Sequence, residues 1–234
     1  MRKFALLATL ACVGGSAFAQ VFPTGPHAAN NFIPFGAGVA GGNPTMHQVF
    51  ASSLFAGLFG GQPVRITQIA FAPGVDGAFD LGQVDINLGY TNAIPGVASG
   101  AGGLVIPTVG GGGNNVGAMS SFFSGGAAFN FTAQSPSNFQ MTFNGLFDYD
   151  PSQGNLLAEI IVPSETNLTL TVSRAAGSAE ASRSFSGMRF AAAESPTTAT
   201  RMQFRTSPVP EPATFAALGL GALALMRRRR NKAA

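Results

Sequence analysis

The chain has 234 residues, of which 46% are hydrophobic and only 10% are charged, with a formal net charge of +3. The basic residues are concentrated at the two ends. Between Gln20 and Val209 there are six arginines, no lysine and nine acidic residues, which gives this body a net charge of −3. Nucleic-acid binding needs clustered cations that neutralise phosphates, so this composition argues against a nucleic-acid partner.

Residues 1–19 have the pattern of a cleavable secretion signal. Two basic residues precede an apolar run over 4–13, and Ala17 and Ala19 place small side chains at positions −3 and −1 of a signal peptidase site. The run is too short for a stable anchor, which needs about 20 apolar residues. We expect a signal helix that uses the Sec translocon and is cleaved by signal peptidase after Ala19, so that the mature protein begins at Gln20.

The single cysteine, Cys12, lies inside this signal. A lipoprotein would carry a Leu-(Ala/Ser)-(Gly/Ala) triplet directly before a cysteine at the cleavage point, and the triplet Thr9-Leu10-Ala11 does not match. The mature protein therefore has neither disulfide bonds nor thiolate metal sites. Its stability has to come from a hydrophobic core, for which about 190 residues suffice.

The body, residues 20–207, has the pattern of a β-rich domain. Four segments alternate apolar and polar residues and three are more continuously apolar. In chain order the seven are 66–71, 84–88, 127–131, 139–143, 156–162, 168–172 and 202–205. Turn-forming pairs such as Gly125-Gly126 and Asp150-Pro151 lie between them, and only 46–59 has the spacing of a helical turn. We predict an all-β domain, an antiparallel β-sandwich of jelly-roll type.

Asp148, Asp150 and Glu159 are weak candidates for a metal site. Together with Ser152 they follow the 1, 3, 5, 12 spacing of a calcium-binding loop. That loop needs glycine at its sixth position, where this chain has Gln153. The simpler interpretation is a turn that joins two strands, and we expect no metal and no other cofactor.

The patterns that would indicate an enzyme are weak. The two histidines, His27 and His47, are not accompanied by a Gly-x-Ser-x-Gly nucleophile motif. Nine acidic residues make a pair at glycosidase spacing unsurprising by chance, and a chain with no tryptophan offers few stacking platforms for sugars. We expect a non-enzymatic protein; a carbohydrate- or calcium-binding module, and then an extracellular hydrolase, are the alternatives.

The C-terminal segment, 208–234, has three consecutive parts. Pro210, Glu211 and Pro212 form a short motif; residues 213–226 carry no charge; and a basic cluster follows, made up of Arg227, Arg228, Arg229 and Arg230. A helix over 213–226 is about 21 Å long at 1.5 Å per residue, somewhat short of a ~30 Å hydrocarbon core. Local thinning covers the difference. The arginines stay in the cytoplasm, which places the body outside.

This tail resembles the PEP-CTERM sorting signal of Gram-negative bacteria. In that family the membrane-embedded cysteine transpeptidase exosortase recognises the motif and removes the tail, and members tend to accompany exopolysaccharide production. The resemblance implies an exported protein with an inner-membrane intermediate that ends at the cell surface or in the extracellular matrix, where exopolysaccharide is a possible partner. An ordinary single-span membrane anchor is the alternative interpretation of the tail.

Overall fold

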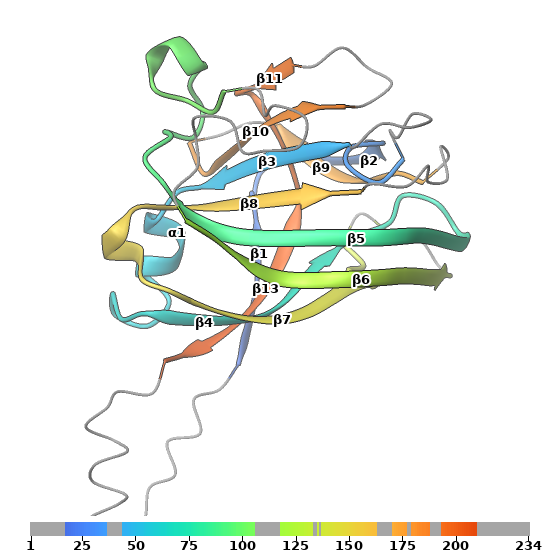
Figure 1. Cartoon of the computed structure of the whole chain (residues 1–234), viewed down its shortest axis with the longest axis horizontal. Helices are drawn as coiled ribbons and strands as arrows, with labels where there is room; N and C mark the ends of the chain where they lie inside the picture. The colour runs from blue at the N-terminus through green and yellow to red at the C-terminus, as the bar shows by residue number, and fades with distance from the viewer. Residues whose placement is uncertain are drawn as a thin grey trace, which may run out of the picture.

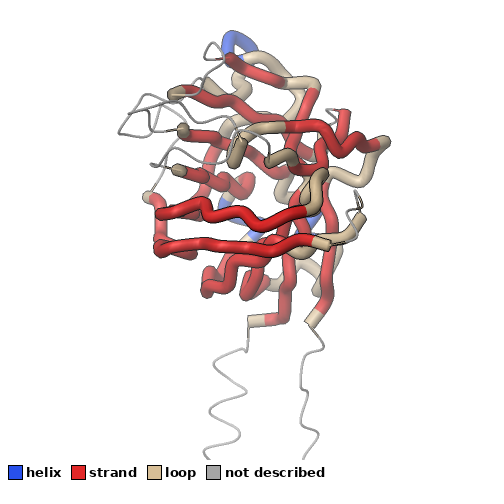
Figure 2. The backbone as a smooth tube through the Cα atoms, turned by 90° about the vertical axis from the view of Figure 1, so that its right-hand side faces the viewer, coloured by secondary structure: helices blue, strands red, loops and turns tan. Residues whose placement is uncertain are grey.

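The computed structural model describes residues 17–36, 44–105, 118–132, 135, 137–162, 170–176, 179–187 and 193–209. The expected signal helix, except for its last residues from Ala17 onward, and the expected helix over 213–226 lie outside these ranges. Strands dominate the described part of the chain (Figure 2).

The strands form three sheets (Figure 1). The four-stranded sheet has the order β1 (Phe18–Phe22), β13 (Met202–Pro208), β4 (Val64–Phe71), β7 (Met141–Tyr149). The six-stranded sheet has the order β11 (Ala193–Ser195), β10 (Ala181–Ser186), β3 (Thr45–Phe50), β8 (Asn155–Ile161), β5 (Gly77–Thr91), β6 (Met119–Phe131). A three-stranded sheet contains β12 (Thr198–Thr200), β9 (Val172–Ala176) and β2 (His27–Asn31).

Every strand pairing recorded in these sheets is antiparallel, which confirms the prediction of an antiparallel all-β body. The finer expectation of a two-sheet jelly-roll sandwich stays a prediction, since the described strands form three sheets. The helical turn expected within 46–59 is present as α1 (Ser53–Ala56), directly after β3. Two short 3₁₀ turns complete the secondary structure of the described ranges, η1 (Ser99–Ala101) and η2 (Pro151–Gln153).

The turn expected at Gly125-Gly126 is wrong, because both glycines lie inside strand β6. Gly125 pairs with Val84 and Gly126 with Gln83 across to β5, next to a register shift that begins after Asp80. Pairing along the long β5 strand therefore outweighs the local preference of the two glycines for a turn.

Aromatic rings join the four-stranded sheet to the six-stranded sheet. The Phe204 ring of β13 lies edge-to-face on the Phe50 ring of β3, with centroids 5.0 Å apart. Phe55 of helix α1 contacts both Phe204 and Tyr149, at 5.5 and 5.1 Å. All four rings are fully buried, and each such pair adds about 0.5–1.5 kcal/mol beyond the burial of its area. Helix α1 is thus held at the core by a single inserted ring.

Gly145 allows the edges of two sheets to approach closely. A Cβ at this position of β7 would collide with the backbone carbonyl oxygen of Phe122 in β6. A backbone atom cannot rotate out of the way as a side chain can, so the approach of β7 to β6 requires glycine here.

A buried side-chain amide joins the six-stranded sheet to the three-stranded sheet. The Gln48 side chain of β3 accepts a hydrogen bond from the Thr200 backbone N–H through Oε1 and donates one from Nε2 to the Thr200 carbonyl oxygen, both at 2.8 Å. Both residues are fully buried. The amide therefore pairs with β12 in the way a neighbouring strand would.

Replacing Gln48 with alanine should destabilise the protein by about 2–4 kcal/mol, because it leaves a buried N–H and a buried C=O without partners. Chemical denaturation of the exported protein measures the change in the free energy of unfolding. Gln68→Ala is the matched control, since it removes a half-buried amide that, within the described part of the chain, donates to the Asn144 side chain; we expect a loss below about 0.5 kcal/mol. Equal losses in the two variants would show that the Gln48 amide does not join the sheets.

Candidate functional site

The predicted signal cleavage site lies on a strand at the edge of the four-stranded sheet. Ala17 is the first described residue, and Ala19 and Gln20 belong to β1, where they pair with Arg205 and Phe204 of β13. Cleavage after Ala19 would leave Gln20 to Phe22 paired with β13. The Phe18 ring, 47% exposed, contacts the Phe59 ring with centroids 5.6 Å apart, and cleavage would remove this contact.

The strand that leads into the predicted sorting motif is bonded to neighbours on both sides. β13 lies between β1 and β4, and after it the Val209 N–H still donates to the Pro63 carbonyl oxygen at 3.2 Å. Because β1 and β13 are antiparallel neighbours, the described chain begins and ends on the same side of the body (Figure 1, Figure 2). Pro210, Glu211 and Pro212, and the cluster Arg227 to Arg230, lie outside the described residues.

The three weak metal candidates have separate partners. Asp148 forms a two-bond ion pair with Arg65, at 2.7 and 2.8 Å, and this partner lowers the pKa of Asp148. Asp150 caps the η2 turn by accepting bonds from Ser152 N and Oγ at 2.9 and 2.7 Å, which lower its pKa. Glu159 lies within the six-stranded sheet. Among the described residues, no group of three or more His, Cys, Asp or Glu side chains is placed to hold a metal ion.

His47 forms a buried polar row with two residues of neighbouring strands. Its Nε2 lies 3.0 Å from Glu159 Oε1, and Asn87 donates from Nδ2 to Glu159 Oε2 at 2.7 Å. The three residues are aligned across β3, β8 and β5. His47 is fully buried and Glu159 is 8% exposed. Sequence reasoning singled out both residues without connecting them, because they are 112 positions apart and give no local signal.

This row holds Glu159 in its charged form. The hydrogen bond to His47 lowers the pKa of Glu159 most, burial opposes it, and the Asn87 bond lowers it further. A carboxyl whose pKa is lower in the folded state stabilises the fold above its unfolded pKa, and this contribution disappears as the pH falls through the folded pKa.

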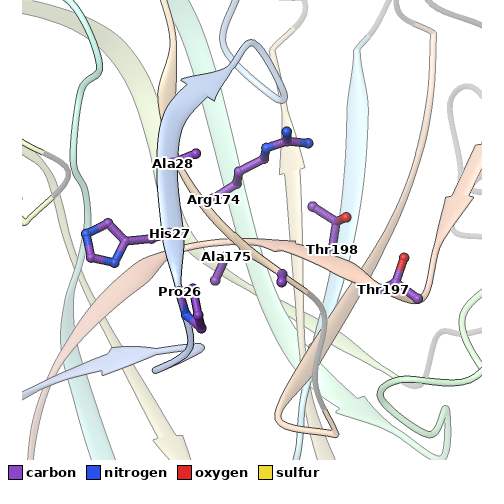
Figure 3. Close-up of a pocket in the computed structure, with 8 residues that line it drawn as sticks. Pro26, His27, Ala28, Arg174, Ala175, Thr197 and Thr198 are labelled. Atoms are coloured by element: carbon purple, nitrogen blue, oxygen red, sulfur yellow. The ribbon is translucent and has the colours of Figure 1, made fainter.

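A pocket of about 360 Å³ opens beside the three-stranded sheet. It is lined by Pro26, His27 and Ala28 of the β2 segment, by Arg174, Ala175 and Ala176 of β9, and by Thr197 and Thr198 at the start of β12. In Figure 3 the Arg174 guanidinium and the two threonines lie on one side of β2, while the His27 imidazole points to the other side. Sequence reasoning did not find this pocket, since its residues come from three distant segments.

Glu159→Gln should destabilise the protein at pH 7 by about 1–3 kcal/mol, because an amide can accept from only one of its two partners and leaves a buried polar group unsatisfied. The difference from the unchanged protein should shrink as the pH falls below the ordinary titration range of glutamate, because the lowered pKa of Glu159 places its protonation there. Denaturation at a series of pH values measures both effects. Asp148→Asn, which breaks the exposed Arg65 pair, is the control and should cost below about 1 kcal/mol. If the difference in unfolding free energy did not change with pH, Glu159 would not be held in its charged form by His47 and Asn87.

Comparison with known proteins gives a match confined to the C-terminal segment. The family model for the PEP-CTERM protein-sorting motif matches residues 208–230. No curated protein and no solved structure matches the chain significantly. Within the described ranges, no helix has the length and apolar character needed to cross a membrane; the expected helix over 213–226 lies outside them.

The matched segment contains Pro210-Glu211-Pro212, the uncharged run and the arginine cluster, and it begins at the last residue of β13. Such a motif indicates an exported protein that undergoes membrane-associated sorting toward the cell surface, with exosortase as its processing partner. By this motif the chain is a PEP-CTERM protein.

Proposed function

We propose that this protein is a non-enzymatic component of the cell surface or extracellular matrix, delivered there by removal of its C-terminal tail. In this proposal the Sec translocon exports the chain, signal peptidase cleaves after Ala19, and the helix over 213–226 holds the intermediate in the inner membrane. Exosortase then acts at Pro210-Glu211-Pro212. The sorting-motif match over 208–230 is the observation that carries the proposal.

The arrangement of the chain ends supports this route. A signal segment and a membrane tail on one molecule have to reach the same membrane surface, and β1 and β13 bring residues 18 and 206 side by side. The chain passes from its last strand residue, Pro208, to the motif with only Val209 between them. We therefore propose that this end of an antiparallel sandwich body faces the membrane until the tail is removed.

The buried histidine supports a non-enzymatic body. A hydrolase of Ser-His-acid type needs an imidazole that reaches substrate, whereas the His47 side chain is fully buried and its Glu159 partner is bonded on both oxygens. The carbohydrate-binding alternative is favoured by one specific observation, the open pocket that Arg174, Thr197 and Thr198 line together with apolar residues.

The mature protein should begin at Gln20, because Ala17 and Ala19 satisfy the −3 and −1 requirement at the end of the apolar run. N-terminal sequencing of the protein recovered from its host identifies the first residue. A protein that begins at Phe18 would instead keep the whole of β1, and retention of Met1 would exclude cleavage altogether; either result contradicts the proposed site.

Glu211→Ala should leave export intact and block removal of the tail. The proline on each side keeps this segment out of the following helix, so the substitution changes the recognised carboxylate without changing the membrane segment. Mass measurement of the membrane and extracellular fractions should find the variant in the membrane with its tail still attached.

Asp80→Ala is the control for the loss of one acidic side chain and should be processed normally. Replacing Arg227 to Arg230 with serine removes the charge that stops transfer, so it should weaken membrane retention before processing. Release of the Glu211 variant with its tail removed would refute the sorting mechanism.

A further inference from the structure

Two cationic side chains lie near Thr200: Arg174, which lines the pocket, and Arg183, which is not one of its lining residues. Arg174 of β9 is aligned with Thr200 of β12 and with Ala28 of β2. Aligned residues in an antiparallel pair point to the same face, with Cβ atoms about 5 Å apart. Thr200 Oγ1 accepts a hydrogen bond from Arg183 Nη1 at 2.9 Å. The Arg174 and Arg183 side chains therefore approach Thr200 from two different sheets.

Arg183 is buried without a compensating charge among the described residues. Its side chain comes from β10, it is 4% exposed, and its Nε has no hydrogen-bond partner. Burial, and then the like charge of Arg174, lower the pKa of Arg183 to about 10. The ion pairs recorded in the described part of the chain involve His47 with Glu159 and Arg65 with Asp148, and neither is here. A buried charge without an opposite charge nearby is strongly unfavourable, and an anion bound at the neighbouring Arg174 would lower this cost.

The open side of the pocket supplies further donors. Thr198 lies on the same face as Arg174, because it precedes Thr200 by two residues in β12. Thr197 is exposed in the preceding turn, and Figure 3 shows both threonines on the side toward which the Arg174 guanidinium extends. A guanidinium presents donors in a planar fork that matches the two oxygens of a carboxylate, phosphate or sulfate group.

We propose that this pocket binds an oxyanion, held by the Arg174 guanidinium and the Thr197 and Thr198 hydroxyls. The ligand is a carboxylate, phosphate or sulfate group, carried either by a small solute or by an acidic polysaccharide. The site depends on the body and not on the sorting tail, so it extends beyond the proposed function.

Calorimetric titration of the full exported protein tests the site, with glucuronate, phosphate and sulfate as probes at constant ionic strength. We expect saturable binding of one anion per chain. Arg174→Gln should weaken it at least tenfold, and Arg174→Lys should weaken it less, because it keeps the charge and loses the fork. Arg205→Gln is the matched control: it removes the same charge from an exposed position of β13 and should leave binding unchanged.

A second titration separates the two sources of the anion. Polygalacturonate supplies the carboxylate on a polymer, and dextran is its neutral control. Polygalacturonate binding that Arg174→Gln abolishes assigns the site to an acidic polysaccharide, whereas binding of the free anions alone assigns it to a solute. The absence of saturable binding to any probe, or equal weakening by the Arg174 and Arg205 variants, would overturn the proposal. Unchanged melting of Arg174→Gln confirms that its effect is not a loss of fold.

Discussion

The structure depends on how strand β3 satisfies polar side chains that are buried on both of its faces. Toward the core, Gln48 bonds to the backbone of Thr200, and toward the other face, His47 bonds to Glu159. Buried polar groups are costly unless they are paired. The Gln48 amide therefore holds β12 against one face of β3, and the His47–Glu159 contact adds to the backbone ladder that pairs β3 with β8.

Both faces of β3 are also covered by apolar side chains. On the core face Phe50 packs against Phe204, whereas on the opposite face Val49 and Leu157 form a separate small cluster with Ala93 and Leu104. The Ser184 hydroxyl bonds to the Val105 carbonyl oxygen on the segment that includes Leu104. On this same face His47 is fully buried and Glu159 is 8% exposed, and burial strengthens the electrostatic interaction between the two groups.

Local pattern in the sequence was sufficient for the strands that are mostly apolar. The segments 66–71 and 84–88 lie in β4 and β5 with their apolar residues buried, and 156–161 of the third segment lies in β8, where the apolar residues are buried except for the half-buried Ile161. Strand β10 could not be found in this way. Its sequence, ASRSFS, looks like an exposed polar segment, yet all six of its residues are buried. It lies between β11, the next strand along the chain, and β3, which comes far earlier in the sequence, so its burial cannot be seen in its own residues.

The sorting motif could be predicted from the sequence and the Arg174 pocket could not, because only the motif is formed by consecutive residues. The sorting motif is contiguous, so its order of proline, acid, apolar run and arginines can be recognised without a fold. The Arg174 pocket is assembled from residues 26–28, 174–176 and 197–198. Its cationic character is also hidden by the net charge of the body, which is −3, because the field at a site is determined by the nearest groups and not by the total. Carboxylates such as Asp148 are neutralised elsewhere by their own partners.

Processing at the two ends of the body has unequal structural consequences. Strand β13 retains all its pairs with β4, from Met202 to Pro208, when the chain is cut beyond Val209. Cleavage after Ala19, by contrast, removes the pairing of Phe18 with Thr206 and of Ala19 with Arg205. The last residues of β13 then have a partner only on the β4 side, and unpaired strand edges are accessible to solvent and to other chains. After both cleavages, β13 would therefore still be held in the sheet by its backbone pairing with β4.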